Sequence, residues 1–297
     1  MTDARASTVG PLVDIRALRI CYRSPAGAVP IVRGVDLDLH PGETVGLVGE
    51  SGSGKSVTGR AILGLLEPRQ MAVAADRFLV DGVDMSAPGR GAGRLDRDSA
   101  RRRPRAAMIF QNPFTSLNPS YTIGNLLREV IRRHHGLRGR ALRERAVELL
   151  DAVKLPDPAA KANCYPHQLS GGQQQRVVIA VALAMRPRVL IADEPTTALD
   201  VTVQAEIVGL LRELQADNGM GILFVSHDLA LISDVASRVF VMRDGEIVER
   251  GDRTLMTGAA QHPYTKALLA AAPSVRVRKP RLPSAGTAAD PEGSLTR

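Results

Sequence analysis

The chain has 297 residues, a formal net charge of +8 and a hydrophobic content of 44%, a composition typical of a globular protein that buries a sizeable core. Its longest apolar run, Val177 to Met185, is much shorter than the roughly 18 residues of a membrane helix, so we expect no membrane span. The N-terminus carries Asp3 and Arg5 and no apolar segment typical of a secretion signal, which predicts a cytoplasmic location.

The excess positive charge is local and does not favour a nucleic-acid-binding protein. Much of it lies in Arg94 to Arg105 and in Arg276 to Arg281, and neither cluster has interleaved aromatic residues. We interpret the clusters as a solvated loop and part of a disordered tail. Cys21 and Cys164 are far apart and lack metal-binding spacing, so we expect both to be reduced and structural.

The N-terminal part of the sequence predicts an antiparallel β region and then a buried strand. After a flexible arm at residues 1–11, alternating apolar residues predict strands at 12–22 and 31–39, with a turn beginning at Ser24. The next apolar run, Thr44 to Val48, predicts a strand buried on both faces that ends in a glycine-rich loop. A helix is predicted at 55–66.

The rest of the chain predicts a small helical lobe and then alternating helices and buried strands. Apolar residues at helical spacing characterise the lobe, between Tyr121 and Asn163. The alternation that follows is typical of an α/β protein with a mostly parallel sheet. From Pro280 onward the composition predicts disorder. Helices are predicted at 171–185 and 203–214, and buried strands at 189–192 and 221–225.

One segment matches the phosphate-binding pattern GxxxxGK[ST] completely, and it lies between a predicted strand and a predicted helix. Glycines let backbone N–H groups approach phosphate oxygens, and the positive end of the helix points at the same place. Lys55 would neutralise the β- and γ-phosphates, and Ser56 would ligate Mg²⁺. The segment consists of Gly49, Glu50, Ser51, Gly52, Ser53, Gly54, Lys55 and Ser56.

Two carboxylates, Asp193 and Glu194, end the apolar run that starts at Val189. Ligands of open α/β sheets collect at the carboxyl ends of strands. Asp193 suits Mg²⁺, directly or through water, and Glu194 suits general-base activation of the attacking water. An acidic pair at a strand end is weak evidence alone, but beside a phosphate loop it predicts a P-loop nucleotide hydrolase.

A third segment, Leu169-Ser170-Gly171-Gly172-Gln173, resembles the LSGGQ signature of ABC ATPases. Ser170 and the N–H groups of Gly171 and Gly172 open a helix and so form a second anion site, although they also fit an ordinary helix cap. In ABC proteins, two subunits sandwich two ATP molecules head to tail. The resemblance therefore implies that Ser170, Gly171, Gly172 and Gln173 bind the ATP of a second ATPase subunit.

Further positions match the family's pattern. Gln111 matches the glutamine that touches Mg²⁺ and the attacking water, and His227 matches the histidine that contacts the γ-phosphate. Asp200 lies in a segment that resembles the D-loop, which crosses to the partner subunit; here Ala198 replaces the serine of many relatives. Tyr22 lies where an aromatic side chain usually stacks on adenine, although it also fits a plain strand residue.

The resemblance runs from about Val13 to Pro273. Within the family, the chain resembles the ATPase subunits of the oligopeptide, dipeptide and nickel importers, particularly the first type of subunit. His262-Pro263-Tyr264-Thr265 is informative about this branch rather than about chemistry. The resemblance implies an ABC ATPase domain at 12–273: a P-loop NTPase core of α/β class, an antiparallel β subdomain, and a helical subdomain inserted at about 114–186. Residues 274–297 would form a disordered tail. Many relatives hold an iron–sulfur cluster in a cysteine-rich tail, but no Cys follows Pro273 and we expect none here.

The resemblance implies a peripheral subunit on the cytoplasmic face of the membrane that uses ATP and Mg²⁺ to energise peptide import. Its partners would be transmembrane permease subunits, a second ABC ATPase of the same or a different sequence and, indirectly, an extracytoplasmic substrate-binding protein. The cargo stays open between dipeptide, oligopeptide, glutathione and nickel chelate. One alternative is an ATPase subunit of a soluble complex such as carbon–phosphorus lyase. Another, an ABC protein acting on nucleic acid, is disfavoured because no coiled-coil insertion or fused second ATPase is present.

Overall fold

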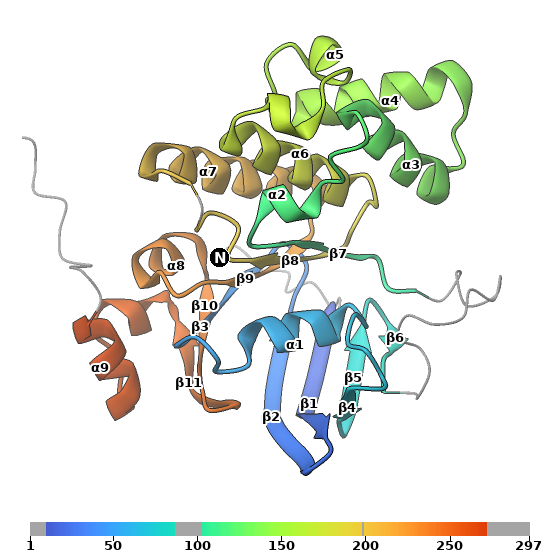
Figure 1. The fold of residues 1–297 in the computed structure, drawn as a ribbon. Coiled ribbons are helices and arrows are strands. Elements are labelled where there is room, and N and C mark those ends of the chain that lie inside the picture. The colour runs from blue at the N-terminus through green and yellow to red at the C-terminus, as the bar shows by residue number, and fades with distance from the viewer. Residues whose placement is uncertain (1–9, 87–102, 198, 272–297) are drawn as a thin grey trace, which may run out of the picture.

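The computed structural model describes residues 10–86, 103–197 and 199–271. Most of the predicted arm, most of the basic cluster at 94–105 and the tail from 274 lie outside the described residues. Figure 1 shows a central sheet with helices on one side of it and, on the other side, an antiparallel sheet with helix α1 (Lys55–Ile62). None of the helices in the described residues is long and apolar enough to cross a bilayer.

Within the described residues, the central sheet has the strand order β11-β10-β3-β9-β8-β7. Neighbouring strands pair in parallel, except that β10 and β11 are antiparallel. The predicted mostly parallel sheet is therefore confirmed. Its strands are β3 (Thr44–Val48), β7 (Ala106–Ile109), β8 (Val189–Asp193), β9 (Gly221–Val225), β10 (Arg238–Arg243) and β11 (Glu246–Asp252).

Successive residues of the central strands face two different hydrophobic cores. In β8, Leu190 and Ala192 belong to the core shared with the helices, whereas Val189 and Ile191 belong to the core shared with the antiparallel sheet. The strand is therefore buried on both faces, which is why its sequence is continuously apolar rather than alternating.

The antiparallel layer confirms the predicted hairpin and extends it. Ser24 pairs with Gly27 across the turn, and Val35 and Leu37 are buried while Asp36 between them is half-exposed. The helix after the phosphate loop ends earlier than predicted, just before Gly64, which has a left-handed φ of 65°. This layer contains β1 (Val13–Ser24), β2 (Gly27–Leu39), β4 (Met71–Ala74), β5 (Arg77–Val80), β6 (Val83–Asp84) and α1 (Lys55–Ile62).

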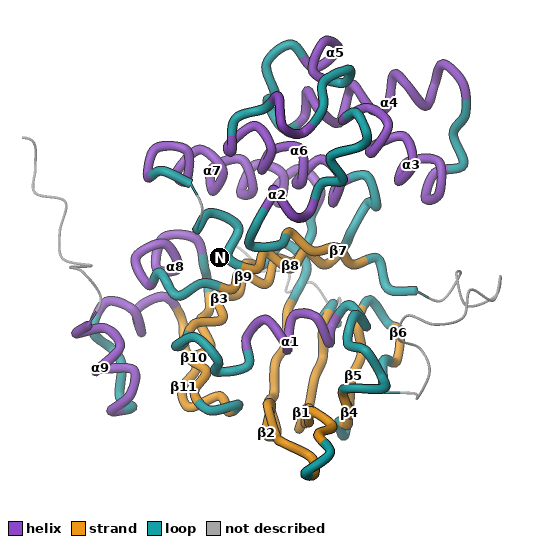
Figure 2. Tube along the Cα trace, viewed as in Figure 1, coloured by secondary structure: helices purple, strands orange, loops and turns teal. Residues whose placement is uncertain are grey.

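The helical layer contains the predicted lobe, and loops join its successive helices (Figure 2). Helix α7 begins earlier than predicted because the Asp200 side chain caps it by accepting the Val203 N–H at 3.0 Å. It ends before Gly219, whose φ is 62°. The helices of this layer are α2 (Pro113–Ser116), α3 (Ile123–His135), α4 (Gly139–Ala152), α5 (Pro158–Lys161), η2 (Pro166–Gln168), α6 (Gly171–Leu183), α7 (Val201–Asn218) and α8 (Leu229–Val235).

The chain then returns to the central sheet and ends its described part in η3 (Arg253–Thr257) and α9 (Pro263–Ala271). Figure 1 shows α9 next to β11, at the edge of the molecule. Cys21 and Cys164 are both free and partly buried, as expected for residues without a disulfide.

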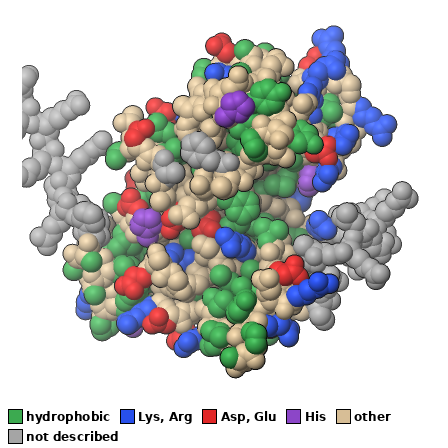
Figure 3. Space-filling view, in the orientation of Figure 1, with side chains coloured by type: hydrophobic (Ala, Val, Ile, Leu, Met, Phe, Trp, Pro, Cys, Tyr) green, Lys and Arg blue, Asp and Glu red, His purple; other side chains and the backbone are tan. Residues whose placement is uncertain are grey.

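The part of the helical layer where α3 leads into α4 carries a group of basic side chains that the sequence analysis did not single out. Figure 3 shows blue side chains gathered there. Arg132 and Arg133 pair with Glu129, and Arg140 pairs with Glu144. These three arginines share only two carboxylates, so the region contributes to the positive charge of the described residues.

One arginine joins the antiparallel layer to the central sheet. Arg238 of β10 contacts Asp38 of β2 at 2.8 Å and donates to Glu43 through Nε at 2.5 Å and Nη2 at 2.9 Å. Burial acts to raise the pKa of Asp38, but the hydrogen bond and charge of Arg238, together with the charges of His40 and Arg16, lower that pKa below 3.8. The ionised form of Asp38 therefore stabilises the contact between the two layers.

Candidate active site

Residues 49–54 form the loop that connects β3 to α1, and Lys55 and Ser56 are the first residues of α1. Each glycine of the loop has a positive φ. Gly54, at the start of α1, has a left-handed φ of 104°. At Gly49, φ is 150°, and an added Cβ would lie 2.0 Å from the carbonyl oxygen of Met242. A side chain at Gly49 would therefore push the loop away from β10.

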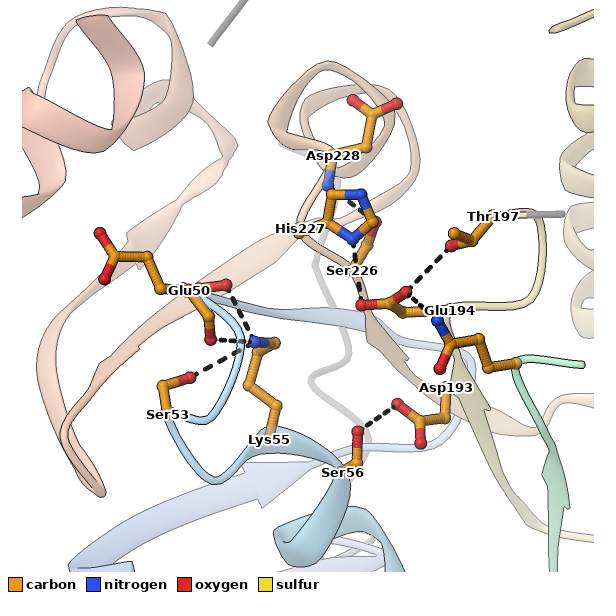
Figure 4. Close-up of polar contacts among 12 residues, drawn as sticks. Glu50, Ser53, Lys55, Ser56, Asp193, Glu194, Thr197, Ser226, His227 and Asp228 are labelled. Atoms are coloured by element: carbon orange, nitrogen blue, oxygen red, sulfur yellow. Dashed lines mark hydrogen bonds and ion pairs between the residues drawn. The ribbon is translucent and has the colours of Figure 1, made fainter. Parts of the chain in front are cut away.

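The Lys55 ammonium lies inside this loop (Figure 4). Its Nζ donates to the carbonyl oxygens of Gly49 at 2.9 Å and Glu50 at 2.7 Å, and to Ser53 Oγ at 3.3 Å. Burial lowers the pKa of Lys55, and the nearby carboxylates, Glu194 foremost, act in the opposite direction. The loop backbone thus surrounds a buried cation, and a buried cation is suited to bind an anionic ligand.

Ser56 and Asp193 bring two oxygen atoms together beside the loop. Ser56 Oγ donates to Asp193 Oδ1 at 2.8 Å, and only 4% of Asp193 is exposed. Burial raises the pKa of Asp193, and the hydrogen bond from Ser56 opposes that rise. Such oxygen atoms fit Mg²⁺, which takes few protein ligands and completes its shell with phosphate and water oxygens. The described residues contain no group of three or more His, Cys, Asp or Glu residues that could hold a metal.

Glu194 follows β8 with a φ of 48°, which is uncommon for a residue other than glycine. Its N–H donates to the Val225 carbonyl at 2.9 Å, and this bond holds the turn against β9. The carboxylate therefore leaves the strand end in a fixed direction.

The Glu194 carboxylate brings the three predicted catalytic residues into one cluster. Its Oε1 lies 3.0 Å from His227 Nδ1, and its Oε2 accepts from Gln111 Nε2 at 2.9 Å. Thr197 Oγ1 also donates to Oε2, at 3.0 Å (Figure 4). Sequence reasoning missed Thr197, and its only signal is its position three residues after Glu194 in a tight turn. A carboxylate held by such contacts can be aimed at a water molecule.

The strand order explains this convergence. The phosphate loop follows β3, His227 comes shortly after β9, Glu194 follows β8 and Gln111 comes shortly after β7. These four strands are consecutive neighbours in the sheet and run in the same direction. Their carboxyl ends therefore meet at one edge, where open α/β sheets bind ligands.

Other predicted residues do not join this cluster. Ser170 caps α6: its Oγ accepts from Gln173 N at 3.4 Å, and Gln173 Oε1 accepts from Ser170 N at 3.2 Å. Within the described residues, none of the hydrogen bonds of 170–173 reaches the phosphate loop. A Cβ added to Gly172 would lie 2.7 Å from Val203 Cγ1, so the backbone of the signature segment packs closely on the start of α7.

Two more predicted residues also lie apart. Asp200 caps α7, as described above. Tyr22 lies in β1, where it pairs with Val29 of β2 and Met71 of β4, and it is 41% exposed. The fold thus leaves the Tyr22 ring accessible on the antiparallel sheet.

The fold and this cluster together define a P-loop nucleotide hydrolase. The chain belongs to the ABC transporter family, whose model matches residues 32–197. Membership of this family means that the chain binds and hydrolyses ATP.

Named relatives are similar over most of the chain. A Brucella melitensis protein provisionally named a peptide import ATP-binding protein is 47% identical over 271 residues, which are 89% of this chain and 78% of that protein. The dipeptide transport ATP-binding protein DppD of Escherichia coli is 45% identical over 276 residues, which are 92% of this chain and 82% of that protein.

Solved structures share the fold. The structure of cbiO1 from Clostridium perfringens, part of the ABC transporter complex cbiONQ, is 25% identical with a TM-score of 0.69, and the match covers 84% of this chain and 92% of that one. The ATP-binding cassette MJ0796, solved as a dimer in a post-hydrolysis state bound to ADP and Pi, is 30% identical with a TM-score of 0.64, and the match covers 81% of this chain and 98% of that one.

Proposed function

We propose that the chain hydrolyses Mg·ATP to energise the import of di- or oligopeptides through an ABC transporter. The observation that carries this proposal is the identity of 45–47% to peptide-import and dipeptide-transport ATP-binding proteins over about nine-tenths of the chain. These relatives favour peptide import over the alternative of a soluble complex such as carbon–phosphorus lyase.

Within the site, the loop 49–56 would wrap the β- and γ-phosphates, with Lys55 turning its ammonium from the loop carbonyls to phosphate oxygens. Ser56 and Asp193 would hold Mg²⁺, and Gln111 would touch both the metal and the attacking water. Glu194 would accept the proton of that water, with His227 contacting the γ-phosphate. The contacts between Glu194 and Gln111, His227 and Thr197 support this assignment.

The signature segment caps α6 and packs on the start of α7 rather than bonding to its own phosphate loop, which supports action as a dimer. In a head-to-tail pair, Ser170, Gly171, Gly172 and Gln173 of one subunit would bind the nucleotide of the other, with Asp200 at the same interface. The similarity to MJ0796, which was solved as a dimer, supports this arrangement. Tyr22 would stack on adenine from the exposed side of the antiparallel sheet.

The domain boundaries and partners follow from the same assignment. Residues 12–273 would form the ABC ATPase domain, with the helical subdomain at about 114–186 and Gln111 at its connection to the core. This subdomain would transmit closure of the dimer to transmembrane permease subunits at the cytoplasmic face of the membrane. An extracytoplasmic substrate-binding protein would deliver the peptide to the permease.

A reconstituted transporter tests this proposal. The chain is assembled with its permease and ATPase partners in vesicles, and Mg²⁺-dependent ATP hydrolysis is measured with peptide-loaded and with peptide-free binding protein. Stimulation by the loaded form supports peptide import. Hydrolysis that no peptide-loaded binding protein stimulates contradicts it and leaves only the ATPase assignment.

A further inference from the structure

The segment that begins α9 makes a direct contact with the phosphate loop, although sequence reasoning gave it no chemical role. Tyr264 is 7% exposed, and its hydroxyl accepts the N–H of Glu50 at 3.1 Å. The two residues are 214 positions apart in the sequence. A side chain outside the nucleotide-binding motifs thus contacts the backbone of the loop itself.

The bonded N–H belongs to the peptide group between Gly49 and Glu50. The carbonyl of the same group, Gly49 O, accepts from Lys55 Nζ at 2.9 Å. The Tyr264 hydroxyl and the Lys55 ammonium therefore hold opposite ends of one peptide group and fix its rotation. If Lys55 turns to a phosphate, as proposed above, the Tyr264 hydroxyl still binds the N–H of the 49–50 peptide group.

Contacts with β10 and β11 keep the Tyr264 hydroxyl in place. The Arg243 guanidinium lies 4.9 Å from the centre of the tyrosine ring. The Glu249 carboxylate accepts the backbone N–H groups of Gln261 at 2.6 Å and His262 at 3.2 Å, just before the helix. Thr265, which follows Tyr264 in the helix, is completely buried. The hydroxyl therefore meets Glu50 from a docked segment rather than from a freely moving side chain.

A second contact holds the middle of the loop to the same hairpin. Gly245, in the turn between β10 and β11, donates its N–H to Ser53 O at 3.1 Å. The loop is thus supported at its start through α9 and at its centre through the hairpin. Fixing a loop in its binding conformation before the ligand arrives lowers the entropic cost of binding.

We propose that Tyr264 is a positioning residue for the phosphate loop: its hydroxyl orients the 49–50 peptide group so that the loop is preformed for ATP. The inference rests on the proposal that residues 49–56 bind the triphosphate and is independent of the cargo. The loop holds the nucleotide before and during hydrolysis, so Tyr264 stabilises the ground and transition states equally. Its loss therefore changes the Kd and KM for ATP, and kcat stays nearly constant.

The test compares Tyr264→Phe, which removes the hydroxyl and keeps the ring, with Thr265→Val. The second variant alters the next, buried residue of the same helix, whose side chain acts on Glu249 rather than on Glu50. ATP binding is measured by calorimetry on the full chain, and KM and kcat are measured on the assembled transporter. Tyr264→Phe should weaken binding and raise KM by about three- to tenfold, the effect of one hydrogen bond, with kcat changed less than about twofold. Thr265→Val should leave both constants within about twofold of the unmodified chain.

Three results overturn the inference: unchanged ATP affinity in Tyr264→Phe, an equal loss of affinity in both variants, or a fall in kcat with constant KM. An equal loss would mean that docking of α9, rather than the hydroxyl, supports the loop. Lys55→Met, measured in parallel, separates this inference from the proposed site. If Lys55→Met loses ATP and Tyr264→Phe does not, the phosphate loop keeps its assignment and only the role of Tyr264 is wrong.

Discussion

Replacing Glu194 with glutamine should nearly abolish ATP hydrolysis and leave ATP binding intact. The amide oxygen can still accept from Thr197, and the amide nitrogen can donate to His227 Nδ1, which lies 3.0 Å from the carboxylate. The cluster can therefore persist without its negative charge. General-base catalysis contributes about 10²–10⁴-fold, so kcat should fall by about that factor, or about 3–5 kcal/mol in the barrier. The Kd for ATP should stay within about threefold, since Lys55 and Ser56 are unchanged.

The assay is steady-state phosphate release at saturating Mg·ATP, with binding measured separately by calorimetry. Glu213→Gln is the matched control, because Glu213 is an exposed carboxylate of α7 that pairs with Lys154. It should hydrolyse ATP at the unmodified rate. Normal turnover in Glu194→Gln would refute the role of this carboxylate as base. Loss of both binding and turnover would mean that Glu194 holds the site together instead.

Three further changes test the loop, the metal site and the packing of the layers. Lys55→Met should weaken ATP binding by about ten- to a hundredfold, because a buried charged donor is lost; calorimetry showing unchanged affinity would contradict the placement of the phosphates. Ser56→Ala should raise the Mg²⁺ concentration for half-maximal hydrolysis at least about tenfold, and an unaltered requirement would remove Ser56 from the metal site. Arg238→Met should lower the free energy of unfolding by about 2–4 kcal/mol near neutral pH, measured in urea. The pKa of Asp38 is lowered in the folded chain, so this stabilisation is present above 3.8 and is lost as the pH falls through the folded value. If the loss of unfolding free energy caused by Arg238→Met stays constant down to pH 3, the contact with Asp38 does not stabilise the fold.

Features that depend on a short, contiguous stretch of sequence could be predicted. The glycine loop is contiguous, and its glycines have the positive φ values that the pattern requires. The strand ending at Asp193 was recognisable because burial on both faces makes β8 continuously apolar. Asp193 and Glu194 could be expected beside the phosphate loop because ligands of open α/β sheets collect at strand ends, whereas Gln111 and His227 were assigned to the site by the family resemblance.

Features that depend on distant contacts could not be predicted. The short strands β4 to β7 have too few residues for a clear periodicity, and pairing with β1, β5 or β8 defines them. The bond between Glu50 and Tyr264 joins two segments whose proximity depends on the whole central sheet. Local chemistry marks Thr197 as a turn residue, and only the folded chain brings its hydroxyl to Glu194.

Peptide uptake driven by ATP tests the central claim most directly. Vesicles containing the complete transporter, with ATP on the side of this subunit and binding protein on the other, should accumulate labelled di- or oligopeptide. Uptake should stop when the subunit carries Glu194→Gln. ATP hydrolysis without accumulation of any peptide, or equal uptake with the Glu194→Gln subunit, would contradict the conclusion that this chain energises peptide import.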